Sequence, residues 1–196
     1  MINCTRQQVV VIAATACLLC SLACDQPGNG KTQEKHTSPT DLLGWQETRW
    51  GMSETELVEV LGDRIEHLPK KQYFKYNTTY TNYFVPEYTL VQTAFEVYLQ
   101  MNDKCGGLSQ VLVRHLDEGS TPHRDFECAD LKTALSAKYG PETSSFASRE
   151  PGLDRMETTW VFPTTTVVLS YSWNEGVSTS LAVRYFPTDK LDLKQL

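Results

Sequence analysis

The chain has no apolar run long enough to cross a membrane. Its longest apolar segment, residues 9–23, falls short of the ~20 residues that a transmembrane helix needs. Basic patches are also missing: 18 basic and 24 acidic residues are interspersed, which argues against nucleic acid as a partner. No G-x-S-x-G elbow occurs either, and we predict no catalytic residue, cofactor or metal site.

The short apolar run has the layout of an export signal. Arg6 and the amino terminus supply positive charge, an apolar centre follows, and Ala23 is a small residue before a cut. The sequence Ser21-Leu22-Ala23-Cys24 resembles the lipobox of bacterial lipoproteins, although lipoboxes usually carry Leu where Ser21 stands. The resemblance implies a signal peptide at 1–23 and a lipid on Cys24. A lipobox ending at Cys17, and cleavage by a general signal peptidase to give a soluble secreted protein, stay open.

The remaining cysteines favour a disulfide. Cleavage before Cys24 leaves Cys105 and Cys128 in the folded part, and an exported protein meets an oxidising compartment in which such a pair tends to close. We therefore predict a Cys105–Cys128 disulfide, with two free thiols as the alternative. Residues 25–40 carry almost no apolar side chains, so we expect them to form a flexible tether.

Two helices are predicted from their ends and their periodicity. Ser53 and Glu56 form a capping box, and Gly62 ends the helix that this box begins. A second helix begins near Asp125 and ends before Gly140. It presents apolar residues at three- and four-residue spacing: Cys128, Leu131, Leu135 and Tyr139.

Alternating residues predict strands in the rest of the chain. Residues 93–101 and 110–116 form one expected hairpin, 166–173 and 177–186 a second, and 156–162 a strand beside it. The period of residues 73–88 is mixed. We predict an α+β fold in which two helix-then-antiparallel-strand units, about 41–118 and 119–196, stand in tandem in one globular domain, 41–196. The sheets of the two units could join, and the helices are expected to pack on one face.

One short motif resembles a known family. Trp50-Gly51-Met52-Ser53, followed by Leu57-Val58 and Leu61-Gly62, is similar to the opening of small bacterial envelope lipoproteins of the SmpA/OmlA type. The tandem layout is similar to that of the β-lactamase inhibitor protein. The two resemblances imply a non-enzymatic protein-binding module, and they transfer no binding residue.

Aromatic residues crowd into 73–88, interleaved with Asn and Thr. Tyr-rich surfaces of this kind suit recognition, which makes Tyr73, Tyr76, Tyr80 and Tyr83 a candidate binding surface for a protein or glycan. The alternative, which we favour, is that they pair across the strands of a sheet. A second cluster, His115, Asp117, Glu118 and His123, has ligand-type side chains, but a polar loop normally has this composition.

The expected protein is a lipoprotein of the bacterial cell envelope that faces the periplasm, in either membrane, and binds a protein or envelope component without catalysis. The alternatives are a small envelope hydrolase that uses the loop from His115 to His123, and a secreted soluble binding protein.

Overall fold

The computed structural model describes residues 41–74, 78–115 and 124–190, which all belong to one compact unit of the chain. The signal segment, Cys24, the tether and Tyr76 lie outside these residues. The described elements, in chain order, are α1 (Glu54–Leu61), the 3-10 turn η1 (Gly62–Arg64), β1 (Glu66–Phe74), β2 (Thr79–Leu90), β3 (Thr93–Asn102), β4 (Leu108–His115), α2 (Asp125–Tyr139), β5 (Ser144–Glu150), β6 (Leu153–Val161), β7 (Thr165–Asn174), β8 (Ser178–Pro187) and η2 (Thr188–Lys190).

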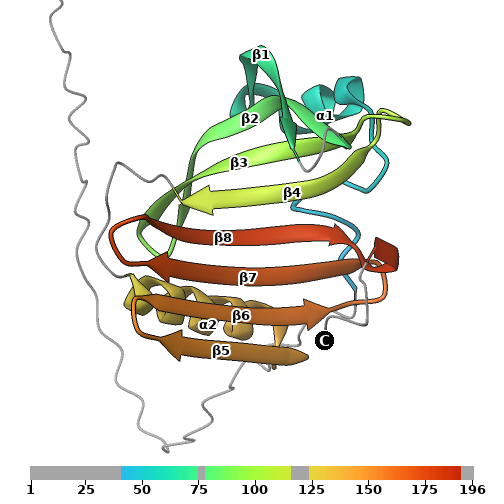
Figure 1. The fold of residues 1–196 in the computed structure, drawn as a ribbon. Helices are drawn as coiled ribbons and strands as arrows, with labels where there is room; N and C mark the ends of the chain where they lie inside the picture. Colours follow the sequence, from blue (N-terminus) through green and yellow to red (C-terminus); the bar gives the residue numbers. More distant parts are fainter. Residues whose placement is uncertain (1–40, 75–77, 116–123, 191–196) are drawn as a thin grey trace, which may run out of the picture. The chain divides into compact units, whose positions relative to one another are not determined.

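All eight strands belong to one antiparallel sheet in the order β1-β2-β3-β4-β8-β7-β6-β5 (Figure 1). The predicted α+β class with two helix-then-strand units is therefore wrong. Strand β4 pairs directly with β8, from Val111 opposite Tyr185 to Arg114 opposite Ala182, so the two runs of strands continue as a single sheet. In the part of the chain that the structure describes, only two short α-helices accompany this sheet, so the fold is β-rich.

Both predicted helices are present. The Ser53 Oγ accepts from the Glu56 backbone N–H (3.3 Å), and the Glu56 carboxylate accepts from the Ser53 N–H (2.7 Å), so the capping box forms as expected. Helix α2 buries Cys128, Leu131, Leu135 and Tyr139, the four residues that its periodicity selects. In α1, Leu57 and Leu61 are buried, whereas Val58, which the sequence also places on the apolar face, is 40% exposed.

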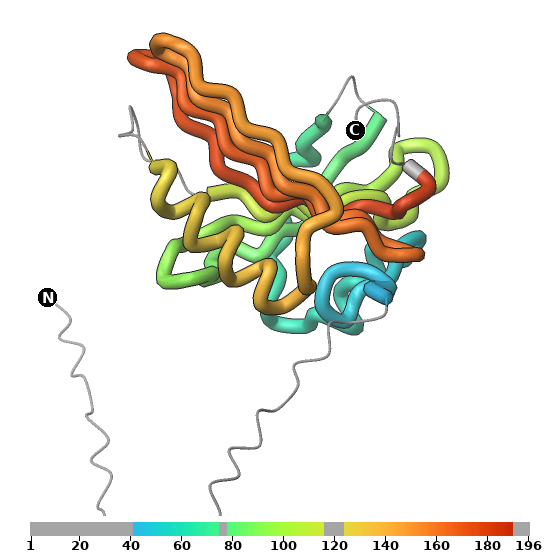
Figure 2. Tube along the Cα trace, turned by 90° about the horizontal axis from the view of Figure 1, so that it is seen from below, coloured from blue at the N-terminus to red at the C-terminus, as the bar shows by residue number. Residues whose placement is uncertain are grey.

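The helices lie on the same face of the sheet. Leu57 of α1 and Leu131 of α2 join one core cluster with alternate residues of the central strands, such as Val97, Val113 and Val183. In Figure 1, α2 is behind the strands, and Figure 2 shows α2 and the blue segment that precedes α1 on one side of them. No described helix covers the opposite face, which we call the open face. An antiparallel sheet tolerates such exposure when the outward side chains are polar.

Hydrogen bonds attach the first described residues to the sheet. Asp41 accepts hydrogen bonds from the Thr164 N–H (2.9 Å) and hydroxyl (2.6 Å), and these donors hold the pKa of its carboxyl below the ordinary value. The Gly51 N–H donates to the Leu108 carbonyl (2.8 Å). A Cβ at Gly107 would lie 2.9 Å from the Gly51 carbonyl oxygen, so this close approach needs glycine.

Three strands were not predicted: the edge strands β1 and β5, and β2, which lies largely in the segment 73–88 of mixed period. Strand β1 contains Pro69, and its pairing with β2 shifts register between His67 and Gln72, so its sequence has no clean alternation. Strand β5 is made largely of serine, arginine and glutamate, with one large apolar residue, Phe146. The strands that were predicted correspond to β3, β4, β6, β7 and β8, to within a few residues at each end.

Candidate functional site

The open face is hollowed over β5–β8. Phe146 of β5, whose side chain is 59% exposed, and the exposed Arg155 line it on the neighbouring strands β5 and β6. Serines of β7 and β8 form the floor beyond them, among them Ser170, Ser172 and Ser180. The hollow has a volume of about 710 Å³. A shallow surface with one large aromatic, hydroxyl groups and charges is suited to hold a ligand by contact area and hydrogen bonds together.

The strands determine this arrangement by their register. Phe146 is opposite Glu157, and Glu157 is opposite Ser170, so these three side chains point to the same face from neighbouring strands. Arg184 of β8 approaches Glu157 at 3.5 Å across β7. Its buried Nε has no hydrogen-bond partner among the described residues. The rim of the hollow therefore carries an ion pair that keeps spare hydrogen-bond donors.

The open face continues into an aromatic cluster over β1–β4. Phe84 stacks on Tyr98 (ring centroids 6.1 Å), and Phe74 meets the same ring edge-on (6.0 Å). The Arg114 guanidinium lies 4.8 Å from the Tyr98 ring and donates to its hydroxyl at 2.8 Å. Burial, reinforced by the hydrogen bond to Glu96, raises the pKa of Tyr98 to about 12, so this hydroxyl stays protonated at neutral pH.

The predicted tyrosine surface is divided in the structure. Tyr80 is only 9% exposed and belongs to the core, whereas Tyr73, opposite it on β1, is 48% exposed. Tyr83 is half-buried, with its ring edge-on to His67 (5.0 Å). Lys71 lies 3.9 Å from the Tyr80 ring, and its ammonium has the geometry of a cation–π contact. Tyr73, Tyr80 and Tyr83 thus do not form one exposed patch, and cross-strand pairing accounts for Tyr73 and Tyr80.

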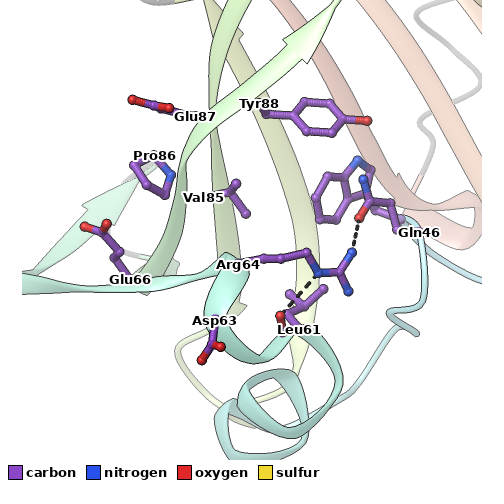
Figure 3. Close-up of a pocket in the computed structure, with 10 residues that line it drawn as sticks. Gln46, Leu61, Asp63, Arg64, Glu66, Val85, Pro86, Glu87 and Tyr88 are labelled. Atoms are coloured by element: carbon purple, nitrogen blue, oxygen red, sulfur yellow. Dashed lines mark hydrogen bonds between the residues drawn. The ribbon is translucent and has the colours of Figure 1, made fainter. Parts of the chain in front are cut away.

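A second hollow, of about 560 Å³, lies between η1 and β2. In Figure 3, Arg64 extends across it towards Gln46, while Glu66 and Glu87 lie on the other side. The guanidinium is already committed, because it donates to Gln46 (3.0 Å), Glu47 (3.0 Å) and the Leu61 carbonyl (3.2 Å). The remaining carboxylates favour positive over negative ligands here.

A third hollow, of about 490 Å³, contains His115 from the loop that sequence reasoning considered for metal binding or hydrolysis. Asp117, Glu118 and His123 lie outside the described residues. Among the residues that the structure does describe, no three ligand-type side chains gather in a way that could hold a metal ion. The hydrolase alternative therefore stays a prediction.

The predicted disulfide is not formed. Cys105 is exposed in the turn that precedes β4, and Cys128 is buried in the first turns of α2, beyond the end of β4; both thiols are free. The eight residues of β4 extend roughly 26 Å at about 3.3 Å each. A disulfide needs its two Cα atoms within about 7 Å, so this separation explains why the pair does not close.

Neither a family model, a curated protein nor a solved structure matches this chain. In the described part of the chain, neither α1 (8 residues) nor α2 (15 residues) is long and apolar enough to span a membrane. The candidate site thus depends on the geometry of the chain itself.

The hollow on the open face includes residues that sequence reasoning passed over. The sequence does not single out Phe146, Arg155 or the floor serines. No element is predicted between the second helix and the strand at 156–162, and serines are common in any solvated strand. One signal was present: Phe146 is a lone large aromatic in an otherwise polar stretch, Ser-Ser-Phe-Ala-Ser-Arg-Glu. An aromatic side chain with no apolar neighbours in its own strand has no core face to join.

Proposed function

We propose that this protein is a lipoprotein of the bacterial cell envelope whose folded domain binds a protein partner through the open face of its sheet and catalyses no reaction. The observation that carries the proposal is the hollow over β5–β8, where Phe146 stands exposed beside a serine-lined floor and an ion pair. Aromatic anchors surrounded by polar groups are characteristic of protein-binding surfaces.

The strands of this surface are held rigidly, which supports binding. All nine residues of β6 pair with β7, and all ten residues of β7 pair with β8, in both cases without a register shift. A rigid surface loses little conformational entropy when a partner docks, so more of the contact energy appears as affinity. The membrane anchor is supported separately, by Cys24 and the apolar segment before it.

Photo-crosslinking from two positions tests the binding surface. A photoreactive phenylalanine analogue replaces Phe146 on β5 or, as the control, Phe126 on α2, which is 62% exposed and belongs to the element on the opposite face. In the native bacterium we expect position 146 to give a discrete adduct with a protein and position 126 to give none. Equal adducts from both positions, or none from 146, would contradict the proposal.

The anchor is tested by the intact mass of the protein purified from its own membrane. A mature chain that begins at Cys24 with added acyl mass supports the lipoprotein proposal. An unmodified mature chain would instead indicate the secreted soluble alternative. In that case the crosslinking result would still decide whether the open face binds a protein.

A further inference from the structure

The third hollow exists because β8 extends past the end of β4. The pairing between them begins at Arg114 opposite Ala182, so residues 178–181 of β8 have β7 on one side and no β4 residue on the other. The hollow of about 490 Å³ opens at this step in the sheet, close to the start of α2. It is lined by side chains from β3, β4, β8 and the residue before α2.

Two of its polar atoms are buried without a partner. Thr179 is only 8% exposed, and its Oγ1 has no hydrogen-bond partner among the described residues. The Nε–H of Arg124, in the same lining, is also shielded from solvent and unpaired. Buried donors without acceptors are rare in folded proteins, because they lose their hydrogen bonds to water and gain none in return. Each such atom therefore calls for an explanation, and a ligand that brings acceptors is one.

The groups around these atoms are mostly donors. The Arg124 Nη1 pairs with the Glu127 carboxylate at 2.8 and 3.1 Å, and the Arg114 Nη2 approaches Glu96 at 3.3 Å. A guanidinium has five N–H donors, so each arginine keeps donors that these contacts do not use. The Ser180 hydroxyl adds another.

The start of α2 lies beside the two unpaired donors. Arg124 is its N-cap residue and makes no side-chain capping hydrogen bond. Asp125 accepts from the Phe126 N–H (2.9 Å), and together with Glu127 it places acidic charge in the first turn, which offsets the positive end of the helix dipole. Glu96 and Glu127 offset the charges of Arg114 and Arg124, so a ligand would be recognised mainly by directed hydrogen bonds.

We propose that this hollow binds an oxyanion, a carboxylate or a phosphate group, which accepts hydrogen bonds from Thr179 Oγ1, Arg124 Nε and the free donors of Arg114. Guanidinium groups match the paired oxygens of both anions. The proposal does not depend on the open face as a protein-binding surface, and neither result decides the other.

The test is a calorimetric titration of the full chain in detergent with sodium phosphate and, separately, with sodium acetate, at an ionic strength held constant with chloride. Thr179→Val removes the hydroxyl without changing charge or volume, and Arg124→Gln removes the guanidinium. Arg49→Gln is the matched control, because it removes one exposed positive charge outside this hollow and outside the hollow on the open face.

The expected result is saturable binding of at least one anion, weakened about tenfold by Thr179→Val, in line with the loss of one hydrogen bond to a charged group, and unchanged in Arg49→Gln. Saturation by phosphate alone assigns a phosphate-bearing ligand, by acetate alone a carboxylate-bearing one, and by both a site that accepts either. No saturation with either anion, or equal weakening in Arg49→Gln, overturns the proposal. If Arg124→Gln does not fold, Thr179→Val decides by itself.

Discussion

The same substitution at two buried threonines should change the stability of the domain in opposite directions. Thr179, in β8, is 8% exposed and its hydroxyl has no partner among the described residues. Thr48 is 1% exposed, and its Oγ1 donates to the Trp45 carbonyl (2.7 Å) and accepts from the Trp45 N–H (3.2 Å). Valine has nearly the same shape as threonine but no hydroxyl, so each replacement changes hydrogen bonding while packing volume stays the same.

The magnitudes follow from these partners. A buried hydroxyl that makes no hydrogen bond costs about 1–3 kcal/mol of desolvation, so Thr179→Val should raise the free energy of unfolding by about 1 kcal/mol once imperfect fit is allowed for. Valine also suits a strand somewhat better than threonine. Thr48→Val leaves the Trp45 N–H without its acceptor, and it should lower the free energy of unfolding by about 1–3 kcal/mol.

Urea unfolding of wild type and both variants, without phosphate or carboxylate buffers, measures the difference. For a domain of this size, 1 kcal/mol corresponds to roughly 2–4 °C in melting temperature, which a thermal scan can confirm. A loss of stability in Thr179→Val similar to that in Thr48→Val would refute the reasoning, since it would mean that the Thr179 hydroxyl is already satisfied in the folded domain.

Three further predictions concern the first helix and the two cysteines. Ser53→Ala removes the side-chain half of the capping box and should cost about 1 kcal/mol in urea unfolding, and no change would show that Glu56 alone suffices. Hydrogen bonds from the Ser53 N–H and hydroxyl lower the pKa of Glu56 below its ordinary 4.5. The stabilisation by its carboxylate is therefore complete above pH 4.5 and lost as the pH falls through the lower folded value. Wild type should accordingly lose stability relative to Glu56→Gln between pH 5 and pH 3, and a constant difference over that range would contradict the assignment. Burial raises the pKa of Cys128 to about 11, so iodoacetamide at pH 8 should alkylate the exposed Cys105 and leave Cys128 unmodified; peptide mapping that finds equal labelling, or a 105–128 disulfide, would contradict the structure.

Elements whose signals are local were predicted well. The capping box at Ser53 needs only residues three apart, and the buried face of α2 follows from the spacing of residues in one helix. The hairpin strands β3–β4 and β7–β8 were predicted from apolar residues at every second position, although residues 97–101 of β3 and 165–169 of β7 are buried on both sides of the sheet. Strands β1, β2 and β5 were not predicted. Strands β1 and β5 lie at the edges of the sheet, where one neighbour is missing and the alternation weakens, and β2 falls largely in the aromatic segment of mixed period.

The fold class depended on a contact that no local pattern contains. Whether two runs of strands form two sheets or one is decided by a single pairing, β4 with β8, between residues about 70 positions apart. The sequence leaves open whether the two sheets join, and this pairing joins them into one β-rich sheet in place of two helix-strand units. The predicted pairing of Cys105 with Cys128 is wrong for a related reason: the count of cysteines suggested partners, but β4 separates them.

The candidate binding residues depend on the tertiary structure in the same way. The aromatic segment makes Tyr73, Tyr80 and Tyr83 candidates, yet Tyr80 is buried in the core while Tyr73, its partner across the β1–β2 pair, is 48% exposed. Residue type indicates that an aromatic can be buried or can bind. Paired residues point to the same side of the sheet, so the difference in exposure comes from the place of β1 at the edge, which follows from the order of the strands.

The sequence by itself determined the ends of both helices, the buried face of α2, five of the eight described strands, and the motif at Cys24 on which the membrane anchor is proposed. These features depend on neighbours a few residues away, for which spacing along the chain is a sufficient guide. Only the tertiary structure decided that the described strands form one sheet and that the face carrying Phe146 is left open by the described helices. It also decided that the Thr179 hydroxyl is buried near Arg124 without a hydrogen-bond partner among the described residues. These depend on which distant segments pair, and the free energy of that choice comes from packing between residues that the order of the chain does not place together.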